Sequence, residues 1–389
     1  MISVRSSLDS DTLVVRLNTE CVRRTTEAPL SKRCSDTKFE PNEDFTNSMI
    51  LSKIVFNAKA SYRASQVRTR RRQSFANAQV IDDEKEKTSM LIGGIEAGGT
   101  KMVCAIGETD GSLETEVKIV DRISVPTKSP EETLPEMIQY FQKWDIQTLG
   151  IGCFGPVDLN RNSATYGCIT KTPKPGWAYC DIVGAFKNAL QIPVGFDTDV
   201  NGAILGEVVW GAAKGCESAL YITVGTGIGV GVYCNGKLVH GLVHPEGGHI
   251  LLERHPGDHF KGNCPFHANC AEGLAAGPAI EKRWGKPAID LADKQEVWEM
   301  EAFYLAQAIA NYVLCYSPQK IVLWGGVMHQ KQLFAMVREK VKELLNGYVD
   351  HEMLDAKIDQ YIVAPALGEN PGILGAMCLG ILERKTTFR

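Results

Sequence analysis

The sequence predicts an α/β fold in which strands paired through glycine turns alternate with helices. Three observations support this prediction. Short apolar runs end in glycine-rich turns, longer segments between them carry helical apolar spacing, and 44% of the 389 residues are hydrophobic. A chain of this length can bury the cores of two domains. The twelve cysteines are scattered, mostly through apolar runs, which is typical of buried reduced thiols in an intracellular protein.

Residues 1–88 differ in composition from the rest of the chain. They are rich in Ser, Thr, Asn and Arg, and glycine is absent before Gly93. Residues 1–80 hold 14 Lys plus Arg against 8 Asp plus Glu, a difference of +6. Such a segment buries too little apolar surface to offset its ordering entropy, so we expect a disordered extension or an initiation site placed upstream of Met90. An organelle-targeting presequence is less favoured because early acidic residues such as Asp9 are unusual there, and we expect a cytoplasmic protein.

From Met90 onward, strands and helices are expected in alternation. Short apolar runs predict strands at 91–95, 102–106, 148–152, 193–197, 220–224, 229–234 and 320–324. Apolar spacing predicts helices at 131–144, 203–210, 296–315, 332–345 and from 371 onward. No run approaches the ~20 apolar residues of a membrane span. The formal net charge of −4 gives no indication of a nucleic-acid partner.

Three glycine turns, each directly after an apolar strand, predict a nucleotide site. They are Glu96–Lys101, Val224–Gly229 and Trp324–Gly326. Glycine lets the backbone approach a ligand closely, and successive amide N–H groups in such turns form concave anion sites. Thr100 and Thr226 add hydroxyl donors for the same phosphate oxygens. The sequence has no G-x-x-x-x-G-K-[ST] motif, so a phosphate site of another kind is predicted.

At these turns the chain resembles the ROK family of sugar kinases, and within it the zinc-containing fructokinases. The resemblance rests on GGIEAGGTK from residue 93, TVGTGIGVG from residue 223 and EGGH from residue 246, and it runs from about residue 90 to the C-terminus. It implies a two-lobed actin/hexokinase-like (ribonuclease H-like) fold with an interlobe cleft. The implied first lobe spans 90–205, with a C-terminal helix at 371–387 packing back onto it. The implied second lobe spans 206–370 and contains a zinc loop at 249–270.

Phosphoryl transfer needs a base near the acceptor hydroxyl, a metal on the phosphates and donors for the developing charge. Asp199 stands between a predicted strand and a predicted helix, and the resemblance places the catalytic aspartate there; a helix N-cap is the alternative. Glu96 stands where many relatives carry Asp and would reach Mg²⁺ or a metal-bound water. The residues expected to contact ATP are Gly98, Gly99, Thr100, Lys101, Thr226, Gly227, Pro278, Gly325 and Gly326. For Lys101, a solvent-facing role is the alternative.

The resemblance gives Glu246 and Glu272 as sugar ligands, with His249 beside them. A carboxylate can accept hydrogen bonds from two adjacent hydroxyls, which suits a polyol. The loop 154–158 is expected to form part of the pocket wall. Trp177 is interpreted either as a platform for the apolar face of a sugar or as a core or lobe-interface residue.

Cys264-x-x-His267-x-x-Cys270 places three soft ligands on one turn and predicts a structural Zn²⁺ site. His249 is the preferred fourth ligand because the family motif holds it there, and His255 and His259 are its rivals. Ala268 stands where relatives usually have glycine, which leaves the conformation of this turn open.

The sequence therefore predicts an ATP-Mg-dependent sugar kinase, and the resemblance implies that it converts D-fructose to fructose 6-phosphate. A mannokinase, glucokinase or broad hexokinase is the nearest alternative. A sugar-responsive regulator is the alternative of another class, but such relatives carry an N-terminal helix-turn-helix, and residues 1–88 show no amphipathic helix pair. The expected partners are ATP, a hexose and, by resemblance, a second copy of the chain in a homodimer, with no nucleic acid and no membrane.

Overall fold

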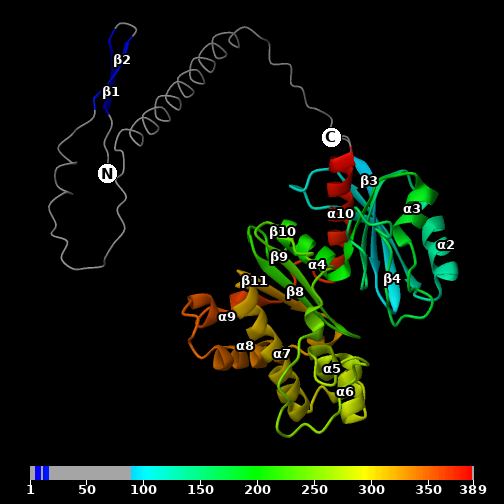
Figure 1. Cartoon of the computed structure of the whole chain (residues 1–389), viewed down its shortest axis with the longest axis vertical. Helices are drawn as coiled ribbons and strands as arrows, with labels where there is room; N and C mark the ends of the chain where they lie inside the picture. Colours follow the sequence, from blue (N-terminus) through cyan, green and yellow to red (C-terminus); the bar gives the residue numbers. More distant parts are fainter. Residues whose placement is uncertain (1–4, 10–11, 17–88, 388–389) are drawn as a thin grey trace, which may run out of the picture. The chain divides into compact units, whose positions relative to one another are not determined.

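The computed structural model describes residues 5–9, 12–16 and 89–387 (Figure 1). Within the extension, the strands β1 (Arg5–Asp9) and β2 (Thr12–Arg16) pair antiparallel, where the sequence predicts no regular element. The expected disorder otherwise falls outside the described residues. The remaining description concerns the compact unit from residue 89 onward.

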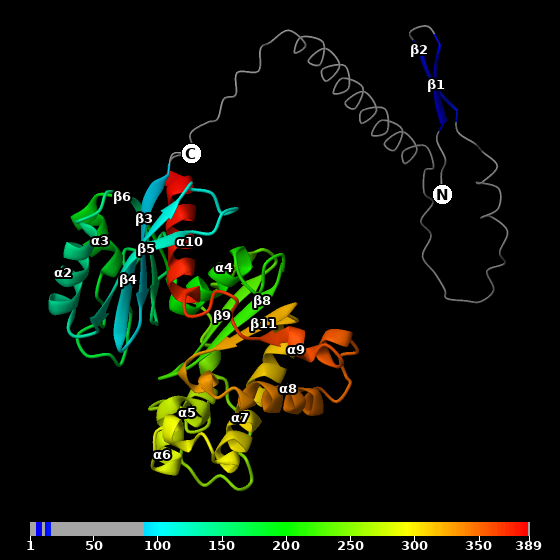
Figure 2. The ribbon, with the colours of Figure 1, turned by 180° about the vertical axis from the view of Figure 1, so that it is seen from behind.

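The first of its two five-stranded sheets has the order β5-β4-β3-β6-β7. β3, β4 and β5 are antiparallel neighbours, whereas β3, β6 and β7 run parallel. The strand bounds are β3 (Met90–Ala97), β4 (Lys101–Thr109), β5 (Lys118–Pro126), β6 (Ile146–Cys153) and β7 (Val194–Thr198). α2 (Pro130–Phe141) and α3 (Ile182–Leu190) cover one face, and α10 (Pro371–Thr387) covers the other (Figure 2). We call this sheet with its three helices the first lobe.

The second sheet has the order β10-β9-β8-β11-β12. Its strands are β8 (Ala219–Val224), β9 (Ile228–Cys234), β10 (Lys237–Leu238), β11 (Lys320–Trp324) and β12 (Ile362–Val363). The helices that follow β10 are α5 (Ala271–Ala275), α6 (Gly277–Trp284), α7 (Gln295–Tyr316), α8 (Gln332–Leu345) and α9 (Ile358–Tyr361). They bury the largest apolar cluster against the sheet. We call this sheet with these helices the second lobe.

The helix α4 (Asp199–Val209) connects the lobes. It leaves the end of β7 in the first sheet, packs against β8 and β9 of the second and contacts α10 (Figure 1). Because β3, β6 and β7 are parallel, their carboxyl ends meet at one edge of the first sheet, and α4 begins there. This architecture is the expected two-lobed actin/hexokinase-like fold.

All seven predicted strands and five predicted helices are present, with ends shifted by a few residues. The largest shift is in α4, which begins at Asp199 rather than at 203. The sequence reading missed β5, β10, β12, α3, α5, α6 and α9. β5 alternates exposed and half-buried residues at a sheet edge, and the other missed elements have nine residues or fewer, so their apolar signals are weak. Within the described ranges, no helix combines the length and apolar character needed to cross a membrane.

Close contact between α10 and the first sheet depends on glycine in the strands. A Cβ on Gly150 would overlap the Ala376 carbonyl of α10. Gly150→Ala is therefore expected to destabilise the fold by about 3 kcal/mol, because backbone groups cannot move aside as side chains do. Gly202→Ala in α4 is the matched control, since the nearest atom outside its own helix turns would be 3.7 Å away. Thermal unfolding of both variants measures this, and equal midpoints would contradict it.

Candidate active site and metal centre

Asp199 is the first residue of α4, at the point where the chain passes from the first sheet to the second. The helix is capped by Thr198, whose hydroxyl accepts a hydrogen bond from the Asn201 N–H at 3.1 Å. The N-cap alternative for Asp199 is therefore excluded. One Asp199 oxygen accepts a hydrogen bond from the Val200 N–H at 2.9 Å.

Burial raises the pKa of Asp199 to about 7, although the Val200 N–H lowers it. The nearby carboxylates of Glu96 and Glu246 raise this pKa further. A carboxylate with a pKa near neutral pH is suited to accept a proton from a sugar hydroxyl. Glu96 lies on the first lobe and Glu246 on the second, so the electrostatics connect Asp199 with predicted site residues of both lobes.

Glu96 lies near the end of β3, and its carboxylate stands against Gly372 in the first turn of α10. Burial raises the pKa of this carboxyl, while the positive charges of Arg122 and Lys101 lower it. Lys101 is exposed at the start of β4, which leaves its direct contact with phosphate a prediction. A half-buried carboxylate at the start of the first glycine turn could hold a divalent cation.

The first glycine turn is closed by backbone hydrogen bonds. The Gly98 N–H donates to the Lys101 carbonyl at 3.1 Å, and the Thr127 hydroxyl donates to the Gly98 carbonyl at 2.8 Å. Gly99 and Thr100 at its tip are exposed, and a Cβ on Gly99 would meet nothing within 4 Å. The tip is therefore open to a ligand.

The second and third glycine turns lie together in the second lobe. Gly325 has a φ of +110°, and a Cβ there would overlap the Val224 carbonyl that precedes the second turn. The Gly277 N–H donates to the Gly225 carbonyl at 2.8 Å, which brings the start of α6 and Pro278 to the same turn. The predicted ATP contacts Thr226, Gly227, Pro278, Gly325 and Gly326 therefore lie on three segments that converge.

Glu272 lies in the first turn of α5 and reaches the second glycine turn. Its Oε2 accepts from the Ile228 N–H at 3.2 Å, and a Cβ on Gly227 would stand 2.6 Å from this oxygen. Its other carboxylate oxygen lies 4.0 Å from His249 Nε2. Glu272 therefore links the phosphate turn to the His249 ring.

Glu246 precedes the short 3₁₀ helix η2 (Gly247–His249), and 47% of its side chain is exposed. Burial and the charge of Glu272 raise its pKa. Its Oε1 lies 3.6 Å from His244 Nδ1, and a Cβ on Gly155 would stand 3.4 Å from the same oxygen. The loop 154–158 of the first lobe therefore borders Glu246, as expected for part of a pocket wall.

His249, Cys264, His267 and Cys270 form a cluster in which the potential ligand atoms all lie within 4.8 Å of one another. His249 Nδ1 lies 3.8 Å from Cys264 Sγ and 3.6 Å from Cys270 Sγ, and His267 Nδ1 lies 3.7 Å from Cys264 Sγ. A tetrahedral zinc ion with bonds of ~2.0–2.3 Å would separate its ligands by about 3.5 Å. Two thiols and two imidazoles at these separations fit zinc.

The rival ligands His255 and His259 do not belong to this cluster. The His255 ring instead accepts from the Gly257 N–H through Nδ1 at 3.1 Å. The turn between His267 and Cys270 brings the ligands together with Ala268 in place of glycine. The Ala268 carbonyl accepts a hydrogen bond from the Arg254 guanidinium. The same guanidinium reaches two further carbonyls of the loop, at Phe260 and Lys261.

Residues 92–382 match the model of the ROK family. The chain belongs to the ROK family. A Bacillus subtilis protein is 54% identical over 289 residues, which cover 74% of this chain and 95% of that protein. The fructokinase of Pediococcus pentosaceus is 47% identical over 290 residues, which cover 75% of this chain and 97% of the relative. The ROK hexokinase of Thermus thermophilus superposes with a TM-score of 0.62 at 28% identity and covers 76% of this chain and 100% of its own.

Trp177 of this ROK chain is a core residue, so its alternative role as a sugar platform is wrong. The side chain is fully buried, its indole N–H donates to the Lys128 carbonyl at 2.6 Å, and its ring meets Phe154 edge-on at 5.8 Å. A tryptophan in this position supports the loop 154–158 from behind. A tryptophan in the sequence is compatible with either a sugar platform or a core residue, and only its burial in the structure distinguishes the two roles.

Two polar residues near the site of this ROK chain were not predicted from the sequence. The Lys174 ammonium donates to the Gly99 carbonyl at the tip of the first glycine turn. His244 Nε2 accepts from the Val157 N–H at 3.1 Å and so joins the second lobe to the first. Lys174 lies three residues before Trp177 in the sequence, and 75 positions separate it from Gly99, so no local pattern predicts their contact.

Proposed function

We propose that this ROK protein transfers the γ-phosphoryl group of ATP to D-fructose and releases fructose 6-phosphate and ADP. The observation that carries the proposal is Asp199, a carboxylate with a pKa of about 7 at the junction of the lobes, in a chain 47% identical to a fructokinase. The kinase proposal also fits the glycine turns, where a Cβ on Gly99 or on Gly326 would meet nothing within 4 Å, so a phosphate can approach the backbone.

Asp199 accepts the proton of the sugar hydroxyl while the hydroxyl oxygen bonds to the γ-phosphorus. The bond from that phosphorus to the β,γ-bridging oxygen breaks, and ADP leaves with the electron pair. Glu246 and Glu272 orient the sugar by accepting hydrogen bonds from its other hydroxyls. The glycine turns at Gly98 and Thr226 hold the phosphates from opposite lobes.

Glu96 is the residue that would hold Mg²⁺ or a water bound to it. The ion would neutralise phosphate charge. The adenosine is expected against Gly325 and Gly326. A pocket of about 490 Å³ opens beside them, lined by residues that include Trp324 and Met328 on either side of this dipeptide. This volume is within the usual range for small-molecule sites.

The cluster of His249, Cys264, His267 and Cys270 is proposed to hold a structural zinc ion. His249 would bind through Nδ1, which leaves Nε2 facing Glu272 and fixes the ring between metal and sugar ligand. A closed set of four ligands leaves no open position for substrate, so the ion would support the loop rather than the reaction. The same proposal places the enzyme in the cytoplasm, where ATP is available, as a homodimer.

The position of the transferred phosphate tests the proposal. The full chain is incubated with ATP-Mg and D-fructose, and the product is identified by phosphorus NMR against authentic fructose phosphates. Fructose 6-phosphate is the expected product. Formation of fructose 1-phosphate, or phosphorylation of glucose or mannose in preference to fructose, would contradict it.

The pH dependence of kcat/KM is expected to follow Asp199. Below pH about 7 the carboxyl is protonated and cannot accept the sugar proton, so activity is expected to fall about tenfold per pH unit on the acid side. Initial rates from pH 5 to 9 at low fructose concentration measure this limb. An acid limb centred near pH 4, the ordinary range of a carboxyl group, would show that the pKa of the base is not raised and would contradict the prediction.

A further inference from the structure

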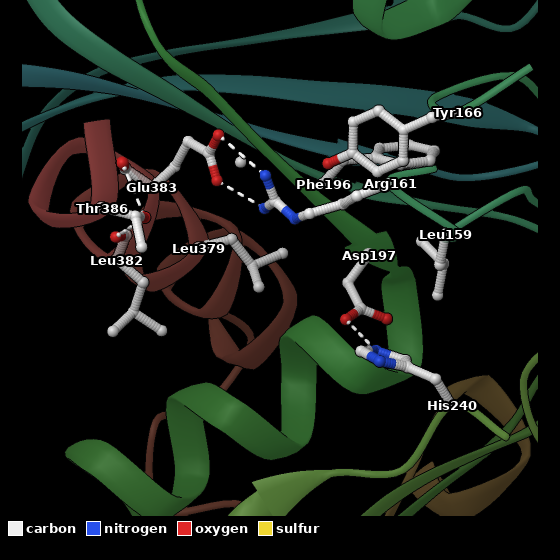
Figure 3. A pocket seen from close by; sticks show the side chains of 11 residues that line it. Leu159, Arg161, Tyr166, Phe196, Asp197, His240, Leu379, Leu382, Glu383 and Thr386 are labelled. Atoms are coloured by element: carbon white, nitrogen blue, oxygen red, sulfur yellow. Dashed lines mark hydrogen bonds and ion pairs between the residues drawn. The ribbon is translucent and has the colours of Figure 1, made fainter. Parts of the chain in front are cut away.

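A second pocket, of about 430 Å³, lies beside the end of β7 and is lined by residues of both lobes (Figure 3). Arg161 and Glu383, both of the first lobe, form an ion pair in its lining, and Asp197 contacts His240 of the second lobe. The predicted nucleotide and sugar contacts are absent from its lining. Its polar groups therefore need an explanation apart from substrate binding.

Asp197 is the centre of a buried hydrogen-bond network in this pocket. The residue is 2% exposed, and its Oδ2 lies 2.7 Å from His240 Nε2. Its Oδ1 accepts from the Thr198 N–H and from the Asn201 side-chain amide, both at 2.8 Å. A buried carboxylate with three donors is well satisfied, so this network is rigid.

The network extends from the first lobe to the second. Asp197 belongs to β7 of the first sheet, and His240 follows β10 of the second. The Asn201 side-chain oxygen accepts from the Val232 N–H of β9 at 3.3 Å. Two separate segments of the second lobe are thus tied to the residues that flank Asp199 on either side.

We propose that the Asp197–His240 pair positions Asp199 by fixing the start of α4 between the lobes, an inference that rests on Asp199 being the base. His240 is a positioning residue, since it has no contact with the predicted substrate ligands in the described structure. The pair determines where the Asp199 carboxylate stands relative to a sugar held by the second lobe. Small displacements of a base reduce the rate of proton transfer far more than they reduce substrate binding.

The charges around His240 support the proposal. The hydrogen bond and charge of Asp197 raise the pKa of His240, while burial opposes this rise. Across the pocket, Arg161 and Glu383 are already paired through two hydrogen bonds, at 3.2 and 2.5 Å. His244 in the same loop has its pKa lowered by burial. Asp197 is therefore the dominant partner of His240, and the pair weakens when His240 loses its proton at alkaline pH.

The Arg161–Glu383 pair provides a matched control. It lines the same pocket and is also an ion pair, but both residues belong to the first lobe. Glu383→Gln removes one charge from the pocket without touching a connection between the lobes. Its expected kcat is that of the unmodified protein, whatever its effect on thermal stability.

The test compares steady-state kinetics of the full chain and four variants: His240→Ala, His240→Gln, Glu383→Gln and Asp199→Asn. His240→Ala is expected to lower kcat about tenfold while KM for fructose and ATP changes less than about twofold. His240→Gln is expected to recover most of kcat at pH 7, because its amide can donate to Asp197.

An unchanged kcat in His240→Ala, or an equal loss of kcat in Glu383→Gln, would overturn the inference. An active Asp199→Asn would remove the base assignment itself and the inference with it. An inactive Asp199→Asn beside a fully active His240→Ala would overturn the positioning role alone.

Discussion

Replacing Asp199 with Asn is expected to lower kcat for fructose phosphorylation by about a thousandfold. The amide has the size of the carboxylate but cannot accept the sugar proton, and its oxygen can still accept the hydrogen bond from the Val200 N–H. KM for ATP is expected to stay within about twofold, because the phosphate turns are separate from Asp199. Coupled detection of ADP measures both constants.

The melting temperature of Asp199→Asn distinguishes a loss of catalysis from a loss of folding. The raised pKa of Asp199 means that the folded protein resists ionising this carboxyl, so its contribution to stability is most favourable below the unfolded pKa and declines as pH rises through about 7. Asp199→Asn removes this cost, and its melting temperature at pH 8 is expected to equal or exceed that of the unmodified protein. A variant that loses activity together with its melting transition, or keeps full activity, would contradict the assignment.

Removal of the proposed zinc ion is expected to produce the second largest effect. Cys264→Ser leaves three ligands, and the loss of zinc would free the His249 ring that faces Glu272. KM for fructose is expected to rise at least about tenfold, and the melting temperature is expected to fall, because the loop loses its central cross-link. Metal content by atomic absorption and fructose KM are measured on the same preparation.

Cys315→Ser is the control for this experiment. Cys315 is exposed on α7 and lies outside the cluster, so its replacement is expected to leave zinc content and KM unchanged. One zinc per chain in Cys264→Ser, or tight fructose binding by metal-free protein, would contradict the structural role. Re-addition of zinc to chelated protein should restore KM if the loop itself has remained intact.

The fold was predictable where a buried run and its turn are contiguous in the sequence. β3 and β4 are largely apolar strands around a glycine turn, and each was found within a few residues of its ends. β5 lies at the sheet edge with alternating exposure, and α3 has nine residues, so neither carries a strong local signal. The formation of β5 and α3 depends on packing against the rest of the first sheet.

The residues of the candidate site were likewise predictable where they belong to a continuous motif, and not where they pair across the sequence. Glu96, Asp199 and the ligand pattern from Cys264 to Cys270 lie in continuous motifs and were named from the sequence. The Asp197–His240 and Val157–His244 contacts join residues 43 and 87 positions apart, and no local pattern encodes such a pairing. Identifying them requires the arrangement of the two lobes.

Sugar-dependent release of ADP by the full chain tests the central claim most directly. Purified protein is supplied with ATP-Mg and with fructose, mannose, glucose or no sugar, and Asp199→Asn is assayed beside it. The account predicts turnover that is highest with fructose and absent from the variant. Folded, zinc-containing protein that releases no ADP with any hexose would contradict it and would favour a sugar-responsive regulator.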